Sequence, residues 1–324
     1  LEAWKESEHR KPLILQGARQ VGKTYSILEF GRTHYENEAY FNFETNPKLN
    51  ETFEEKISPD YLIPILSHIA GQTIVKEKTL IVFDEVQLCE RALTSLKYFC
   101  EDAPDYHIIV AGSLLGVAVN RAKFSFPVGK VDMKTLYPMD MEEFMIAVGE
   151  DELVEQIKKC FETNRPMPSA LHDAAMQLYR QYLVVGGMPE CVMQFVQTGD
   201  YILIRHTQDT ILTSYLNDMS KYNNLNEIKK TRLAYDNITV QLSKKNTRFQ
   251  YKLIKKGGRA SEFKNAIEWL CLSGIVSQVY RVEQIKKPLE NYRDIDAFKI
   301  YVSDLGLLCA KKDLAANDIL YMVE

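Results

Sequence analysis

The sequence predicts an α/β fold in which a parallel sheet is followed by a helical region and a third, basic region. Between Leu13 and Gly149, short apolar runs alternate with helical stretches, and this alternation indicates βαβ units. From Ser169 to about Asn226 the pattern is helical throughout. After Asn226, three helical stretches precede two β-like runs, an order typical of a winged helix.

Composition narrows the class of protein before any motif is considered. The chain has 324 residues, of which 46% are apolar and 26% charged, the ordinary mix of a globular protein with more than one domain. A net charge of −4 excludes a protein that binds polyanions through its overall charge. The six cysteines form no CxxC pair and no zinc-finger spacing, which predicts reduced thiols in a cytoplasmic protein.

The apolar runs and the two ends of the chain bear on membrane segments, signal peptides and truncation. No apolar run approaches the roughly 18 residues of a membrane helix, so no membrane partner is expected. No signal peptide is recognisable. The chain starts without Met and ends without a helix stop, and we expect it to be truncated at both ends.

Four apolar runs are the expected strands of the sheet. Strands buried on both faces of a parallel sheet have this continuous apolar character. The runs are PLILQ (12–16), AYFNFE (39–44), TLIVFDE (79–85) and YHIIVAGS (106–113). Each is followed by polar residues or glycine, as expected where a strand gives way to a loop.

The loop after the first run carries the pattern G-x-x-x-x-G-K-[ST], as GARQVGKT from Gly17 to Thr24. A loop that wraps a triphosphate turns its backbone N–H groups inward, and side chains at Gly17 and Gly22 would obstruct it. Lys23 is expected to reach the phosphates, and Thr24 supplies a hydroxyl ligand for Mg²⁺. The nucleotide-contacting residues are predicted to be Gly17, Ala18, Arg19, Gln20, Val21, Gly22, Lys23, Thr24 and Tyr25.

The third run places an acidic pair at the end of a buried strand. Asp84 is predicted to hold the metal across from Thr24. Glu85 follows directly and is predicted to be the general base for the attacking water. A solvated strand end is the alternative interpretation of such a pair.

The fourth run ends in Ser113, whose hydroxyl could contact the terminal phosphate or the water. An ordinary helix N-cap is an equally good interpretation of Ser113. The sequence lacks Asn-Lys-x-Asp and a DxxG switch, both expected of a GTPase, so the predicted ligands are ATP or ADP with Mg²⁺. For the arginine that assists phosphoryl transfer, the candidates are Arg19, Arg121, Arg180 and Arg205, and Lys130 occupies a position where an arginine could have stood.

The third region is strongly basic. Residues 221–264 contain twelve Lys or Arg and three Asp or Glu, a local balance of +9. In a winged helix, residues 244–264 could contact DNA phosphates, with the helix expected after Gly258 in a major groove. A protein-interaction module is the alternative. The clustered cations are Lys244, Lys245, Arg248, Lys252, Lys255, Lys256, Arg259 and Lys264.

Taken together, GARQVGKT, LIVFDEVQ, AGSLLG, FPVGKV, LYPMDMEEF, LVVGGMPE and YVSDLGLL resemble the bacterial and archaeal AAA-like P-loop ATPases with a DUF4143-type C-terminal region. The resemblance implies a P-loop ATPase core at 1–165, a helical lid at 166–226 and a winged-helix domain at 227–324. It also suggests that GGMPE is a recurrent lid turn, which we interpret as a helix stop followed by a proline-started helix.

These observations lead to one main functional hypothesis and two alternatives. The main hypothesis is an ATPase in which Mg²⁺–ATP binds the core and hydrolysis repositions the winged helix. One alternative is a DNA-binding regulator with nucleotide as a structural or switch ligand. The other is a scaffold whose winged helix binds a protein partner, and the oligomeric state stays open.

Overall fold

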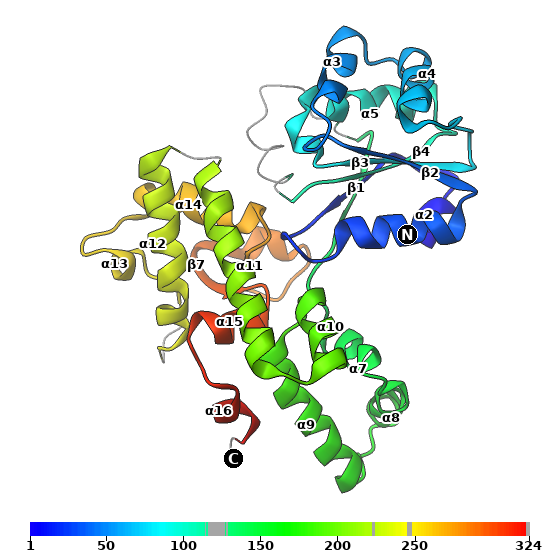
Figure 1. Ribbon diagram of the computed structural model, residues 1–324. Coiled ribbons are helices and arrows are strands. Elements are labelled where there is room, and N and C mark those ends of the chain that lie inside the picture. The colour runs from blue at the N-terminus through cyan, green and yellow to red at the C-terminus, as the bar shows by residue number, and fades with distance from the viewer. Residues whose placement is uncertain (114, 116–126, 128, 222–223, 245–247, 322–324) are drawn as a thin grey trace. The chain divides into compact units, whose positions relative to one another are not determined.

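The structure is a computed structural model that describes residues 1–113, 115, 127, 129–221, 224–244 and 248–321 (Figure 1). It forms two compact units, Leu1–Leu136 and Tyr137–Glu324. The expected division at residues 165 and 226 stays a prediction.

The first unit contains a five-stranded parallel sheet with the order β2-β3-β4-β1-β5. The four apolar runs form its strands as predicted: β1 (Leu13–Gln16), β2 (Asn37–Asn42), β3 (Thr79–Asp84) and β4 (His107–Ala111). All residues of β3 and β4 are buried. Strand β5 (Asp132–Thr135), a largely exposed edge strand that pairs with β1, is not among the strands that the sequence predicts.

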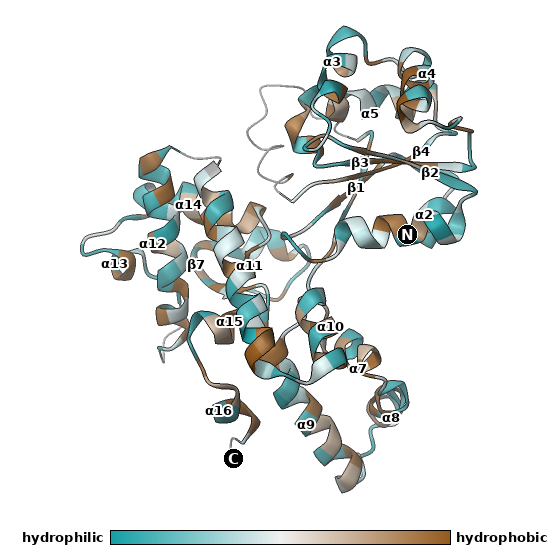
Figure 2. Cartoon of the chain, in the orientation of Figure 1, coloured by the Kyte–Doolittle hydropathy of each residue, from teal (hydrophilic) through white to brown (hydrophobic). Residues whose placement is uncertain are grey.

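Helices cover both faces of this sheet. On one face, α3 (Lys48–Glu55), α4 (Pro59–Ala70) and α5 (Glu90–Asp102) form a core with the strands. On the other face lie α1 (Glu2–Lys5) and α2 (Lys23–His34) (Figure 1). Strands β3 and β4 are brown in Figure 2 because both of their faces are apolar, which is the reason they form continuous apolar runs in the sequence.

The second unit begins with five helices. They are α7 (Met141–Ala147), α8 (Asp151–Glu162), α9 (Ser169–Val185), α10 (Pro189–Thr198) and α11 (Tyr201–Lys221). A capping box between Asp140 and Glu143 starts α7. Helix α9 stops at Gly186, with φ 75°, and Pro189 opens α10. The interpretation of GGMPE as a helix stop and a proline start is confirmed.

The basic region has the expected order of elements. Three helices, α12 (Leu225–Leu242), α13 (Tyr251–Ile254) and α14 (Ala260–Leu272), precede the antiparallel strands β6 (Val276–Val282) and β7 (Arg293–Val302). Two short helices, α15 (Leu305–Lys311) and α16 (Ala316–Leu320), follow. Two 3₁₀ turns complete the described elements, η1 (Val86–Leu88) and η2 (Leu289–Tyr292). The winged-helix assignment of this region stays a prediction.

A buried aspartate joins distant segments of the second unit. The Asp304 carboxylate, 4% exposed, accepts hydrogen bonds from the Gly187 N–H at 2.6 Å and the Leu307 N–H at 2.7 Å. The Gly187 carbonyl accepts from the Met139 N–H at 2.7 Å, and a Cβ on Gly187 would lie 1.9 Å from the Met139 carbonyl oxygen. Two stretches that carry the family resemblance, LVVGGMPE and YVSDLGLL, therefore meet at one packing junction.

Candidate functional site

The loop between β1 and α2 has the backbone that a phosphate-binding loop requires. Positive φ angles occur at Gly17 (150°), Gln20 (65°) and Gly22 (90°). Residues other than glycine rarely adopt this region of backbone conformation. A Cβ on Gly17 would lie 2.2 Å from the Leu136 carbonyl oxygen. Two constraints therefore require glycine at position 17: its backbone angle and the close approach of the Leu136 carbonyl oxygen.

Lys23 is folded back onto the loop. Its Nζ donates to the carbonyl oxygens of Gly17 at 3.0 Å and Ala18 at 2.7 Å, and the side chain is only 7% exposed. Burial lowers the pKa of Lys23 to about 8, against the opposing effect of the Glu85 and Asp84 carboxylates. An anionic ligand in the loop would favour the charged form of this lysine.

The predicted metal ligands are adjacent. Thr24 Oγ1 donates to Asp84 Oδ2 at 2.9 Å, and the Asp84 side chain is 5% exposed. A hydroxyl and a carboxylate oxygen are the hard ligands that Mg²⁺ prefers, and Mg²⁺ typically takes only one or two protein ligands beside water and substrate phosphates. These two side chains fit such an ion. The described residues contain no cluster of three His, Cys, Asp or Glu that would form an all-protein metal centre.

Glu85 leaves the sheet in a left-handed turn. Its φ is 51°, and the turn η1 that follows brings Gln87 back so that Gln87 Nε2 donates to Glu85 Oε2. Burial raises the pKa of Glu85, and the nearby Asp84 carboxylate adds to this rise, whereas the Gln87 hydrogen bond and Lys23 lower it. A carboxylate whose proton affinity is raised in this way suits a general base.

Sequence reasoning missed Tyr40 and Asn42 on β2. Tyr40 OH donates to the same Asp84 Oδ2 at 2.8 Å, and Asn42 Nδ2 donates to Tyr40 OH at 3.1 Å. Burial raises the pKa of Tyr40 to about 12, so the phenol remains a donor. Parallel pairing of Asn42 with Asp84 brings β2 beside the site. The alternation in AYFNFE, which turns Tyr40 and Asn42 to one face of the strand, was the available signal.

The remaining loop positions differ in exposure. Ala18 and Val21, 3% exposed each, pack into the interior, whereas Tyr25 is 74% exposed. Arg19 is close enough to Lys23 to lower its pKa, an effect smaller than that of burial. Ser113 is buried two residues after β4, at the same edge of the sheet as Asp84. The roles predicted for these residues stay predictions.

The arginine candidates are only partly located. Arg121 lies outside the described residues. Arg205 donates to the Leu314 carbonyl oxygen and pairs with Asp313 at 3.4 Å. Its guanidinium thus binds two neighbouring residues of the second unit. Lys130 pairs with Glu101 at 2.9 Å. The structure gives no geometric reason to prefer Arg180.

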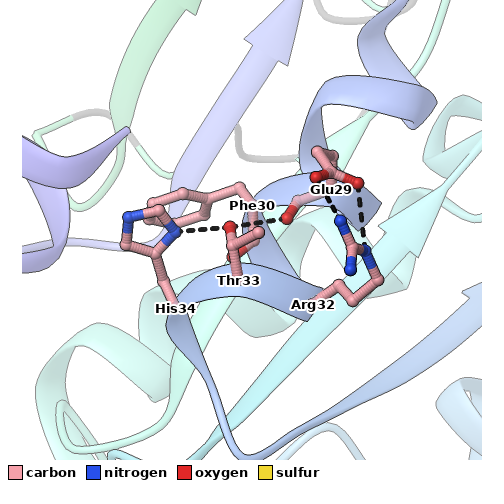
Figure 3. A network of polar contacts seen from close by, with 5 residues as sticks. All are labelled: Glu29, Phe30, Arg32, Thr33 and His34. Atoms are coloured by element: carbon pink, nitrogen blue, oxygen red, sulfur yellow. Dashed lines mark hydrogen bonds and ion pairs between the residues drawn. The ribbon is translucent and has the colours of Figure 1, made fainter.

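The end of helix α2 opposite the loop carries a network of polar contacts within the helix. Figure 3 shows this end, where Thr33 Oγ1 donates to the Glu29 carbonyl oxygen at 2.7 Å and lies 2.7 Å from His34 Nδ1. The Arg32 guanidinium lies in the last turn, where the negative end of the helix dipole favours a positive charge. The positive end of α2 is left facing the loop, which favours a phosphate there.

The glycine loop, the lysine and the acidic strand end lie together on a parallel sheet, the arrangement that is typical of P-loop domains. Residues 9–145 match the family model described as "AAA domain", and residues 176–318 match "Domain of unknown function (DUF8612)". The matched C-terminal family is thus DUF8612, where the sequence resemblance had suggested a DUF4143-type region. No curated protein matches the chain.

Solved structures resemble the chain at low sequence identity. The Walker-type ATPase PABY2304 of Pyrococcus abyssi is 13% identical, with a TM-score of 0.57 over 96% of this chain and 94% of that one. The ORC2 protein of Aeropyrum pernix, as ADPNP-ADP complexes, is 11% identical, with a TM-score of 0.42 over 95% and 87% of the two chains. The RuvB Holliday junction branch migration motor of Thermotoga maritima is 13% identical, with a TM-score of 0.34 over 85% and 84%. The first likeness supports the fold, and the other two are too distant to support an argument.

Among the described residues, no helix is both long and apolar enough to span a bilayer.

Proposed function

We propose that the chain binds ATP with Mg²⁺ and hydrolyses it. The observation that carries this proposal is the 2.9 Å hydrogen bond between Thr24 and Asp84, which pairs a P-loop hydroxyl with a strand-end carboxylate. The match of residues 9–145 to the AAA domain supports the same conclusion. ATP is favoured over GTP because the sequence lacks the motifs that read guanine.

Each residue has a separate role in this proposal. The N–H groups of the loop and of the first turn of α2 would cradle the phosphates. Lys23 would exchange its bonds to the Gly17 and Ala18 carbonyls for the phosphate oxygens. Thr24 and Asp84 would hold Mg²⁺, which when bound neutralises charge on the transferring phosphate. Glu85 would accept the proton of the attacking water.

Two variants test the proposal with different expected outcomes. Lys23→Ala should abolish ATP binding measured by isothermal titration calorimetry. Glu85→Gln should keep binding while turnover falls by roughly 10²–10⁴-fold. Lys97→Ala, at an exposed position of α5, is the matched control and should behave as wild type. Unchanged turnover in Glu85→Gln would show that the base is wrongly assigned.

For the basic region, we propose that nucleotide state repositions a winged helix that contacts DNA through residues 244–264. Lys252, Lys256, Arg259 and Lys264 have exposed side chains, and the buried side of α14 leaves Lys264 facing outward. Exposed cations on one short segment would contact phosphates rather than read bases. The expected binding is therefore weakly sequence-dependent and sensitive to salt.

Fluorescence anisotropy with a labelled DNA duplex tests this second proposal. Wild type should bind at about 50 mM salt and lose most of its affinity by about 200 mM. The triple variant Lys252→Ala/Lys256→Ala/Arg259→Ala should bind more weakly with a shallower salt dependence. Lys76→Ala/Lys78→Ala, exposed in the first unit, is the control. No binding even at low salt would contradict the proposal and favour a protein partner.

A further inference from the structure

The Gln87 side chain is wedged between Glu85 and the segment that follows β4. Its Nε2 donates to Glu85 Oε2. Its Oε1 is buried and has no hydrogen-bond partner among the described residues. A Cβ placed on Gly112 would lie 2.1 Å from this Oε1 and 3.2 Å from Gln87 Cδ. The same amide therefore contacts the acidic residue on one side and the backbone of Gly112 on the other.

The backbone around Gln87 is held in place by the core. The Leu88 N–H donates to the Glu85 carbonyl oxygen at 3.1 Å, and the Cys89 N–H donates to that of Val86 at 2.9 Å. Val86 is fully buried and Cys89 is 5% exposed. With the turn fixed by these bonds and by this burial, Glu85 and Gly112 determine where the Gln87 amide lies.

Chemistry determines which end of the amide faces Glu85. A carboxylate only accepts hydrogen bonds, so the NH₂ group must point toward Glu85 and the carbonyl oxygen toward Gly112. Glu85 Oε2 thereby accepts a hydrogen bond from Gln87. In the proposed reaction, Oε1 would accept the proton of the water.

We propose that Gln87 is a positioning residue for ATP hydrolysis, which fixes the Glu85 carboxylate and links it to the Gly112–Ser113 segment at the end of β4. This inference rests on the proposed ATPase function. A shift of the segment after β4 pushes on the Gln87 amide and moves the base. The position of Glu85 thus depends on a residue that touches neither nucleotide nor metal.

A double-mutant cycle between Gly112 and Gln87 tests the link. Gly112→Ala should fold, because the atoms nearest to the added methyl group are the far end of the Gln87 side chain and, at an ordinary contact distance of 3.5 Å, Leu115 Cβ. The displaced amide should lower kcat by roughly tenfold, the size expected for a hydrogen bond to a charged group, with KM for ATP within about twofold of wild type. Gln87→Ala should show the same loss. The double variant should be no slower than Gln87→Ala alone, because the atom that the methyl group displaces is gone.

Gln87→Met separates positioning from packing. Methionine keeps the volume of glutamine but cannot donate to Glu85, so its kcat should fall as far as that of Gln87→Ala. Wild-type kcat in Gln87→Met, or multiplicative losses in the cycle, would overturn the inference while leaving the ATPase proposal intact. A wild-type chain that binds ATP without turning it over would overturn both.

Discussion

Asp84 in the first unit and Asp304 in the second are both buried, but their carboxylates are bound by different kinds of donor. Asp84 is 5% exposed and Asp304 is 4% exposed, so burial does not distinguish them. Asp84 Oδ2 is held by the hydroxyls of Thr24 and Tyr40, and its Oδ1 accepts from the backbone N–H of the next residue, Glu85, at 2.9 Å. Asp304 is held by the backbone N–H groups of Gly187 and Leu307. The difference lies in whether the donors can move.

Side-chain hydroxyls can rotate away, whereas backbone N–H groups in a packed turn cannot. Oδ2 of Asp84 can therefore exchange a hydroxyl partner for a cation without moving the chain. Asp304 cannot release its donors unless the turn at Gly187 and the start of α15 separate. We therefore expect Asp84, whose Oδ2 is bound by two hydroxyls beside the glycine loop, to serve a ligand, and Asp304 to serve the packing of the second unit.

The largest effect should come from Asp84→Asn. The amide keeps the size of the side chain but removes the charge that would hold Mg²⁺, so ATP turnover should fall by roughly 10²–10³-fold. The free energy of unfolding should change by less than about 1 kcal/mol. Steady-state ATPase assays and urea denaturation measure the two quantities. A large loss of stability with normal turnover would mean that Asp84 is a structural residue of the same kind as Asp304.

Asp304→Asn should give the reverse result. One amide oxygen cannot replace a carboxylate that accepts from several backbone N–H groups, and its NH₂ group would face a donor. The free energy of unfolding should fall by about 2–3 kcal/mol. ATP affinity, measured by calorimetry on the folded variant, should stay at the wild-type value. Asp318→Asn, which lies outside this junction on α16, is the control. Weakened ATP binding in Asp304→Asn would contradict a purely structural role for Asp304.

The two units should also differ in their response to acid. Burial, with smaller effects from Arg10 and Lys5, lowers the pKa of His107 in the first unit to about 4. An unfolded histidine titrates near 6.5, so the unfolded chain binds the proton first, and the first unit loses about 2 kcal/mol of stability between pH 7 and about pH 5. Burial raises the pKa of Asp304 above its ordinary value, despite its backbone N–H bonds. The folded second unit therefore binds a proton at Asp304 more readily than the unfolded chain does, so the contribution of this group to the stability of the second unit rises as the pH falls.

The two tryptophans make this acid effect measurable unit by unit. Trp4 packs against His107 in the first unit, with ring centroids 6.2 Å apart, and Trp269 is buried in the second. Because the chain contains only two tryptophans, Trp269→Phe leaves Trp4 as the sole reporter of urea unfolding. His107→Gln in this background should flatten the pH dependence, and His9→Gln, at an exposed position, should not. A slope that persists in His107→Gln would assign the acid sensitivity to other groups.

Local sequence signals were sufficient for the strands, the loop and the acidic pair. The strands of the sheet interior are buried on both faces and are continuous apolar runs, and the loop has a fixed spacing of glycines and lysine. Strand β5 was not predictable because its side chains are largely exposed and it is defined only by pairing with β1. Tyr40 and Asp304 contact residues 44 and 117 positions away, and no local pattern encodes such contacts. Gln87 was visible in LIVFDEVQ, but its role depends on Gly112, which only the folded chain brings near.

The backbone of Leu136 sets a practical limit on dividing the protein. Its N–H donates to the Gln16 carbonyl oxygen at 2.8 Å, and its own carbonyl oxygen lies against Gly17. A recombinant fragment that ends at Leu136 keeps both the edge strand beside β1 and the support behind the glycine loop. A fragment trimmed before Asp132 exposes the open edge of β1 to aggregation, and removes the surface on which the loop rests.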